Sequence, residues 1–247
     1  MARRTLWPRE HGAYAQLGMP MITALAIRSP SWSALALATG ACLAFLANEP
    51  LLVVLGHRGA RLRESLGRSA SRRLAITLAG AVLATGIGLS RAPAPALLLA
   101  AIVAAPALAM IVLAVTRSAH SLWGELVAAV ALPGAAAPVA AASGLSWQTA
   151  AVLWLAWSIG YAASVVSVHE VLRRNRRAWP GLALAVLAVA TGCASVVERE
   201  LLAALPLVGV GAFVAIRLPS ARRVRSIGVA MVVASTGAAA LALVVNA

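Results

Sequence analysis

The stretch from Ala94 to Val115, APALLLAAIVAAPALAMIVLAV, decides the fold because it carries no charged side chain. A helix that crosses a bilayer needs about 20 mostly apolar residues, and this stretch is long enough. Similar runs recur on both sides of it, so that 62% of the chain is hydrophobic and only 11% is charged. A soluble domain has about half apolar and about a quarter charged residues. The chain is therefore predicted to be an all-α, polytopic transmembrane helical bundle.

The same length criterion, applied along the chain, predicts nine spans in a single transmembrane domain of residues 1–247. The spans cover about 11–27, 33–55, 74–90, 94–115, 123–142, 148–169, 179–197, 201–216 and 226–245. Pro133, Gly134 and Pro138 predict a kink in the fifth span, which is tolerated where neighbouring helices cover the freed carbonyls.

The arginines give the spans a direction. All 21 basic residues are arginine, and the net charge is +14. With the N-terminus in the cytoplasm, 18 of the 21 arginines fall in cytoplasmic segments, and only Arg28, Arg91 and Arg199 fall outside. Because positive residues concentrate in cytoplasmic loops, we expect a multi-pass protein of the inner (plasma) membrane with its C-terminus outside. The scattering of these arginines among loops between spans argues against a nucleic-acid partner.

Polar residues at the ends of two spans suggest a site, because ionisable groups at membrane depth usually mark function. Asn48 and Glu49 lie near the end of the second span and precede a long arginine-rich loop, and His169 and Glu170 end the sixth. The two glutamates are 121 residues apart, which fits a pseudo-repeat of about 1–120 and 121–247. A plain ion pair with Arg173 or Arg174 would explain His169 and Glu170 equally well.

Other polar groups near the cytoplasmic face also have two interpretations. Glu10 and His11 either contact a ligand or simply suit the start of a helix, and Glu125 is open to the same two interpretations. Arg61 and Arg117 either grip phosphate, for which the arginine fork is suited, or only set the topology and contact anionic lipid.

The segment Trp7–Pro20 reads WPREHGAYAQLGMP. It resembles the opening signature of the YwiC-like membrane protein family, in which a basic residue, Glu, His and Gly precede the first span. A polar and basic stretch after the second span extends the similarity along most of the chain. The resemblance implies an integral membrane protein and specifies no reaction.

The layout resembles, more remotely, the UbiA superfamily of intramembrane prenyltransferases, in which nine helices surround a central cavity. Two aspartate-rich motifs of that superfamily end the second and sixth helices and hold magnesium and a prenyl diphosphate. The resemblance implies catalytic roles for Glu49, Glu170 and Asn48, with Glu49 and Glu170 as Mg²⁺ ligands. This chain has no aspartate, so each motif retains at most one carboxylate, whereas magnesium usually takes several oxygen ligands.

Two hypotheses of function follow. The first is a divergent UbiA-like prenyltransferase, or a prenyl-diphosphate- or lipid-binding protein, with a polar cavity that faces the cytoplasm. Its expected substrate contacts are Glu10, His11, Arg61, Arg117, Glu125, His169 and Arg173. The alternative is a non-catalytic transporter or a lipid- or cofactor-binding protein that uses the same cavity. Membrane lipids and an isoprenoid or other lipid-like ligand are the expected partners, and whether the chain is an enzyme is left open.

Overall fold

The computed structural model describes residues 11–173, 179–217, 219 and 224–246. Within these ranges every regular element is a helix, as the apolar runs predict. The elements are α1 His11–Ile27, α2 Trp32–Val54, α3 Ala60–Ser90, α4 Ala94–Val115, α5 Leu122–Gly134, α6 Ala136–Ala142, α7 Trp147–Arg173, α8 Trp179–Ala194, the 3-10 helix η1 Arg199–Ala204, α9 Leu205–Arg217 and α10 Val224–Asn246.

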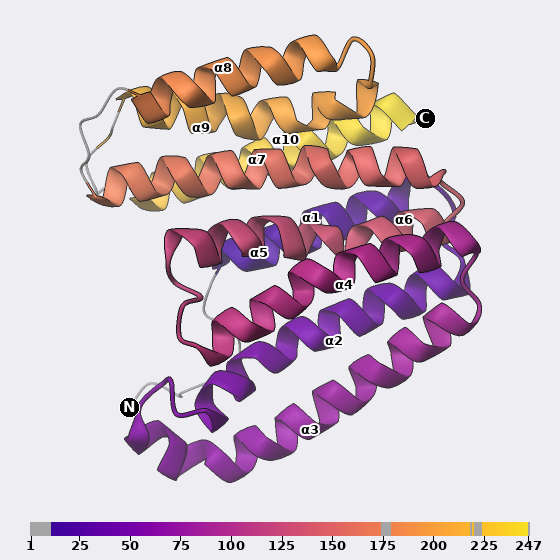
Figure 1. Cartoon of the computed structure of the whole chain (residues 1–247), viewed down its shortest axis with the longest axis vertical. Coiled ribbons are helices and arrows are strands. Elements are labelled where there is room, and N and C mark those ends of the chain that lie inside the picture. Colours follow the sequence, from indigo (N-terminus) through magenta and orange to yellow (C-terminus); the bar gives the residue numbers. More distant parts are fainter. Residues whose placement is uncertain (1–10, 174–178, 218, 220–223, 247) are drawn as a thin grey trace.

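The helices run back and forth, so that their ends gather at two opposite ends of the bundle (Figure 1). At one end α2, α4, α7 and α9 finish, and α3, α5, α8 and α10 begin. This is called the arginine-rich end below, because it holds Arg58, Arg61, Arg63, Arg117, Arg217 and Arg225. The opposite end carries Arg28, Arg91 and Arg199, as the charge distribution predicts for a set of membrane spans.

Seven segments are long and apolar enough to cross a membrane. They are α2, α3, α4, α5 with α6, α7, η1 with α9, and α10. Seven of the nine predicted spans are thus confirmed by length and composition. The other two, α1 and α8, are shorter apolar helices. Large apolar side chains on the outer face of α8, such as Leu182 at 66% exposure and Val189 at 67%, suit contact with lipid chains.

The arginine-rich stretch after the second span is helical, which corrects the predicted loop. Helix α3 starts at Ala60 and has 31 residues, so that Arg61 lies in its first turn. The stretch contains no proline, and its arginine, leucine and alanine residues all favour helix. At 1.5 Å per residue α3 is about 46 Å long, which exceeds the roughly 30 Å of bilayer hydrocarbon, and its arginine-bearing start extends beyond the apolar part.

The predicted kink in the fifth span is confirmed. The helix divides at Ala135 into α5 and α6, between Pro133 and Pro138. The indole Nε1 of Trp154 on α7 donates a 2.8 Å hydrogen bond to the Val130 carbonyl just before the break. A neighbouring helix therefore satisfies a carbonyl at the kink, as a broken helix in a membrane requires.

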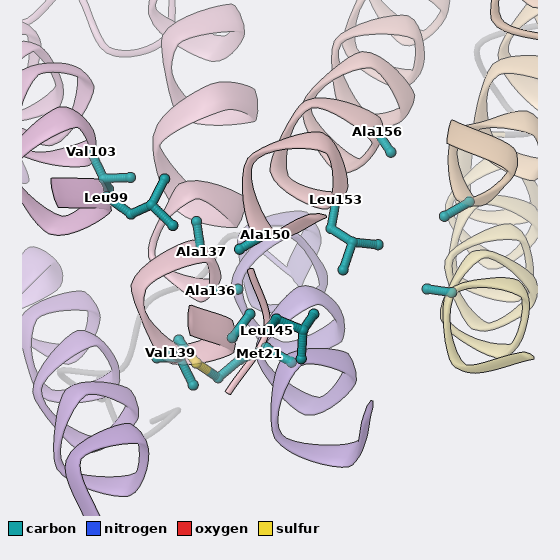
Figure 2. Packing of buried hydrophobic residues seen from close by; sticks show 14 of the residues in the cluster. Met21, Leu99, Val103, Ala136, Ala137, Val139, Leu145, Ala150, Leu153 and Ala156 are labelled. Carbon is teal, nitrogen blue, oxygen red and sulfur yellow. The ribbon is translucent and has the colours of Figure 1, made fainter. Parts of the chain in front are cut away.

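The core forms around the short helix α6. Figure 2 shows Val139 of α6 close to Met21 of α1, with Leu99 of α4 and Leu153 of α7 on neighbouring elements. All four of these side chains are buried. Alanines fill much of the remaining core, and such small residues let membrane helices approach closely.

Helices α2 and α3 pack closely against each other along their length. A Cβ on Gly40 would collide with the side chain of Thr85, and a Cβ on Gly88 would lie 2.7 Å from Leu37 Cγ. The hydroxyl of Ser33 donates a 2.7 Å hydrogen bond to the Gly88 carbonyl. These contacts fix the α2–α3 hairpin, which forms one side of the bundle in Figure 1.

Candidate ligand-binding cavity

A cavity of about 1680 Å³ lies among α1, α2, α3, α4, α5, α6, α7 and α10. Pockets for drug-sized molecules are about 300–1,000 Å³, so this cavity has the capacity for a lipid-sized ligand. On α2 its wall runs from Leu37 to Leu52, which corresponds to about 22 Å at the helical rise per residue. Towards the opposite end of the bundle the wall is mostly apolar and includes the polar side chain of Thr85.

The polar part of the wall gathers at the arginine-rich end. It is made by Asn48, His57, Arg58, Arg117, His120, Glu125 and Arg225, with Gln16 of α1 further along. These residues come from the end of α2, the turn that follows it, the α4–α5 connection and the starts of α5 and α10. The middle of the wall also carries the hydroxyls of Tyr161, Ser164 and Ser235, each of which donates to a backbone carbonyl. The cavity therefore has its charged groups at one end, and the rest of its wall is mostly apolar.

A two-point ion pair fixes the turn after α2. Arg58 donates from Nε to Glu49 Oε1 at 3.0 Å and from Nη2 to Glu49 Oε2 at 2.7 Å. Glu49 is 1% exposed and Arg58 24% exposed. Gly56 and Gly59 allow the chain to fold back, because their φ angles of 76° and 97° suit glycine far better than other residues.

The connection between α4 and α5 has a well-defined conformation. The Ser118 amide donates to the Leu113 carbonyl at 2.9 Å, which closes the end of α4 in the manner of a Schellman motif. The Ser121 hydroxyl accepts from the Gly124 amide at 3.1 Å and so caps α5. A Cβ on Gly124 would lie 2.5 Å from the Ala119 carbonyl oxygen, so only glycine lets the connection lie this close to the helix.

Several polar groups on the cavity wall have unused hydrogen-bonding capacity. Within the described part of the chain, the side chains of Asn48, Arg117 and Arg225 make no hydrogen bond or ion pair. His57 and Glu125 likewise have no partner among the described residues. A polar group without a partner in the protein is hydrated or binds a ligand, so these side chains are available to a ligand.

The structure brings together three of the residues predicted to form the site. Asn48, Arg117 and Glu125 all line the cavity. Glu49 does not line it, because its carboxylate is turned to Arg58. Arg61 is exposed near the start of α3 and is not part of the wall either.

The other predicted residues lie elsewhere or outside the described part of the chain. His169 and Glu170, near the end of α7, are not in the cavity wall, and His169 Nε2 and Glu170 Oε2 are buried without a hydrogen-bond partner among the described residues. Glu10 lies outside the described residues, as do the side chains of His11 and Arg173.

Three residues of the wall, Arg58, Arg225 and Gln16, are not among the site residues predicted from the sequence. Arg58 had a usable signal, since the glycines of Gly56-His57-Arg58-Gly59 indicate a tight turn that returns the chain to the end of α2. Gln16 has a signal as well, since it is an uncharged polar side chain inside an apolar span. Arg225 has no sequence signal that separates it from arginines that only set the topology.

The donor set does not fit the expected magnesium ion. Both oxygens of Glu49 are engaged by Arg58, and Glu170 lies away from the cavity wall. No group of three or more His, Cys, Asp or Glu residues that could hold a metal is present among the described residues. Magnesium requires several oxygen ligands in octahedral geometry, which these side chains do not supply.

The fold and the apolar outer faces define the chain as an all-helical, multi-pass membrane protein in contact with membrane lipids. Residues 7–141 match the model of the YwiC-like protein family, so the chain belongs to that family. No curated protein and no solved structure matches the chain.

Proposed function

We propose that the cavity binds a membrane amphiphile with an anionic, phosphate-type head, such as a prenyl diphosphate or a related lipid. The observation that carries this proposal is the division of the cavity into a charged end, with arginines that have no partner among the described residues, and a long, mostly apolar remainder. A diphosphate or phosphate group suits Arg117 and Arg225, because guanidinium binds such oxygens through two parallel hydrogen bonds. The apolar wall then accommodates the hydrocarbon chain.

The charge at the polar end favours an anion over a cation. Arg58 is neutralised by Glu49, which leaves Arg117 and Arg225 against a single carboxylate, Glu125, among the ionised groups of the described wall. The arginine-rich end faces the cytoplasm in this proposal, in agreement with the positive-inside rule. The head would therefore lie at the cytoplasmic surface and the hydrocarbon chain would extend towards the bilayer centre.

The proposal stands on binding and assigns no magnesium-dependent step. A prenyltransferase reaction is the alternative, and a transporter is a second one. The half of the cavity towards the opposite end has no charged residue in its described wall, which suits a hydrocarbon chain better than a path for ions.

Binding of labelled geranylgeranyl diphosphate to the purified full-length protein in lipid nanodiscs tests the proposal. We expect saturable binding that exceeds that of inorganic diphosphate or geranylgeraniol by at least about tenfold, because head and chain each contribute. EDTA should change the affinity less than about twofold. Competition by phosphatidic acid would identify a phospholipid as the natural occupant. Equal binding of the headless alcohol would contradict the proposal, and release of diphosphate only with Mg²⁺ and an acceptor would favour the transferase.

A further inference from the structure

Arg117 has an unusual backbone. Its φ is 61°, and it is the only residue other than glycine with positive φ in the described part of the chain. This left-handed conformation is unfavourable for an L-residue, and helices that end in this way usually place glycine there. The chain has 19 glycines but places arginine at this position.

The surrounding hydrogen bonds account for the conformation of the backbone but not for the choice of side chain. The Ser118 amide reaches back to Leu113, and the Ser121 hydroxyl donates to the Ser118 carbonyl at 2.7 Å. Glycine at position 117 would satisfy the same bonds without strain. The arginine side chain makes no hydrogen bond or ion pair with the described residues, so it contributes no visible stabilisation to the fold.

The position of the side chain supplies a reason. Arg117 is exposed, lines the polar end of the cavity and is carried by a connection whose geometry is fixed at both helix ends. We infer that Arg117 binds the phosphate-type head of the bound amphiphile. The chain keeps arginine in the left-handed conformation, at a cost in stability, because this conformation places the guanidinium at the head. This inference rests on the proposed function and names the head contact. Strained backbone that persists at a binding site is a recognised form of preorganisation.

Substitutions at position 117 separate binding from stability. Arg117→Gly relieves the strain and removes the guanidinium, so we expect the melting temperature to rise by about 2–5 °C. The same variant should bind geranylgeranyl diphosphate about 10- to 100-fold more weakly. Arg117→Ala keeps the strain, so it should lose binding to the same extent without gaining stability. Arg117→Lys keeps the charge but not the fork, and should bind several-fold more weakly than the natural residue.

Arg91→Gly is the matched control, since Arg91 is also an exposed arginine that ends a helix, has an ordinary φ of −119° and lies at the opposite end of the bundle. Arg91→Gly should leave binding unchanged and should not raise the melting temperature. If the unmodified protein binds the probe and Arg117→Gly binds it equally well, this inference is wrong while the proposed function stands. If Arg117→Gly melts no higher than Arg117→Ala, the idea of strain retained for function is wrong. If the unmodified protein binds no prenyl diphosphate, both proposals fall.

Discussion

Arg58 Nη2 lies 2.7 Å from Glu49 Oε2, and this pair links the buried end of α2 to the turn that precedes α3. Glu49 is thereby a positioning residue: it neutralises Arg58 and holds the turn that carries both Arg58 and His57 into the cavity wall. The sequence places this glutamate where a metal-binding motif was expected, but the geometry gives it an intramolecular cation as its partner.

Substitution of Glu49 should therefore affect stability. Glu49→Gln leaves Arg58 partly buried without its counterion, and we expect a loss of about 2–4 kcal/mol, because breaking a buried ion pair is costly and the exposed part of Arg58 lessens the loss. Thermal unfolding in detergent measures it. The double variant Glu49→Gln/Arg58→Gln should recover part of the loss.

Glu64→Gln is the control for this experiment, since Glu64 is exposed on α3 and has no ion pair among the described residues. It should change stability by less than about 0.5 kcal/mol. If the melting temperature of Glu49→Gln equals that of Glu64→Gln, the ion pair does not stabilise the fold.

The α4–α5 connection should be sensitive to a single methyl group. In Gly124→Ala the new Cβ would meet two backbone carbonyl oxygens, of Ser118 and Ala119, each at 2.5 Å. Backbone cannot move aside cheaply, so we expect the connection to shift, the melting temperature to fall and prenyl-diphosphate binding to weaken with the displacement of Arg117.

Gly67→Ala provides the comparison, because Gly67 lies inside α3 and nothing lies within 4 Å of its added Cβ. Alanine there should be neutral or stabilising by up to about 1 kcal/mol, since it favours helix. Equal behaviour of the two variants would contradict the close packing described for Gly124.

Much of the architecture could be predicted from the sequence, for physical reasons that also explain the failures. The apolar pattern predicts a first span at 11–27, which are the bounds of α1, and Pro133 and Pro138 predict the break between α5 and α6. The arginines after the second span predict a loop and a third span from about 74, but α3 begins at Ala60, because a polar stretch without proline continues a helix into the headgroup region.

The candidate site was predictable only where polarity alone was informative. Asn48, Arg117 and Glu125 stand out as polar residues at the ends of spans, and the cavity contains all three. The pairing of Glu49 with Arg58 could not be predicted by helical spacing, because the turn between them brings residues nine positions apart together. The roles of Asn48, Arg117 and Glu125 in ligand binding are predictions that the binding measurements test.

Cysteine labelling in cells tests the proposed orientation. In a chain with Cys42 and Cys193 replaced by alanine, a cysteine at exposed Ser90, at the opposite end, should react with a membrane-impermeant maleimide in cells whose plasma membrane is intact. A cysteine at exposed Ser65, at the arginine-rich start of α3, should react only after lysis. The reverse pattern would place the arginines outside and contradict the cytoplasmic orientation.

Photo-crosslinking with a prenyl diphosphate that carries a diazirine at the end of its hydrocarbon chain tests the binding proposal most directly. The proposal predicts that the label, competed by unlabelled probe, attaches to peptides of the apolar cavity wall around Leu37, Ala100 and Pro138. Labelling confined to outward-facing positions such as Leu182 and Val189 of α8, and unaffected by competition, would contradict it.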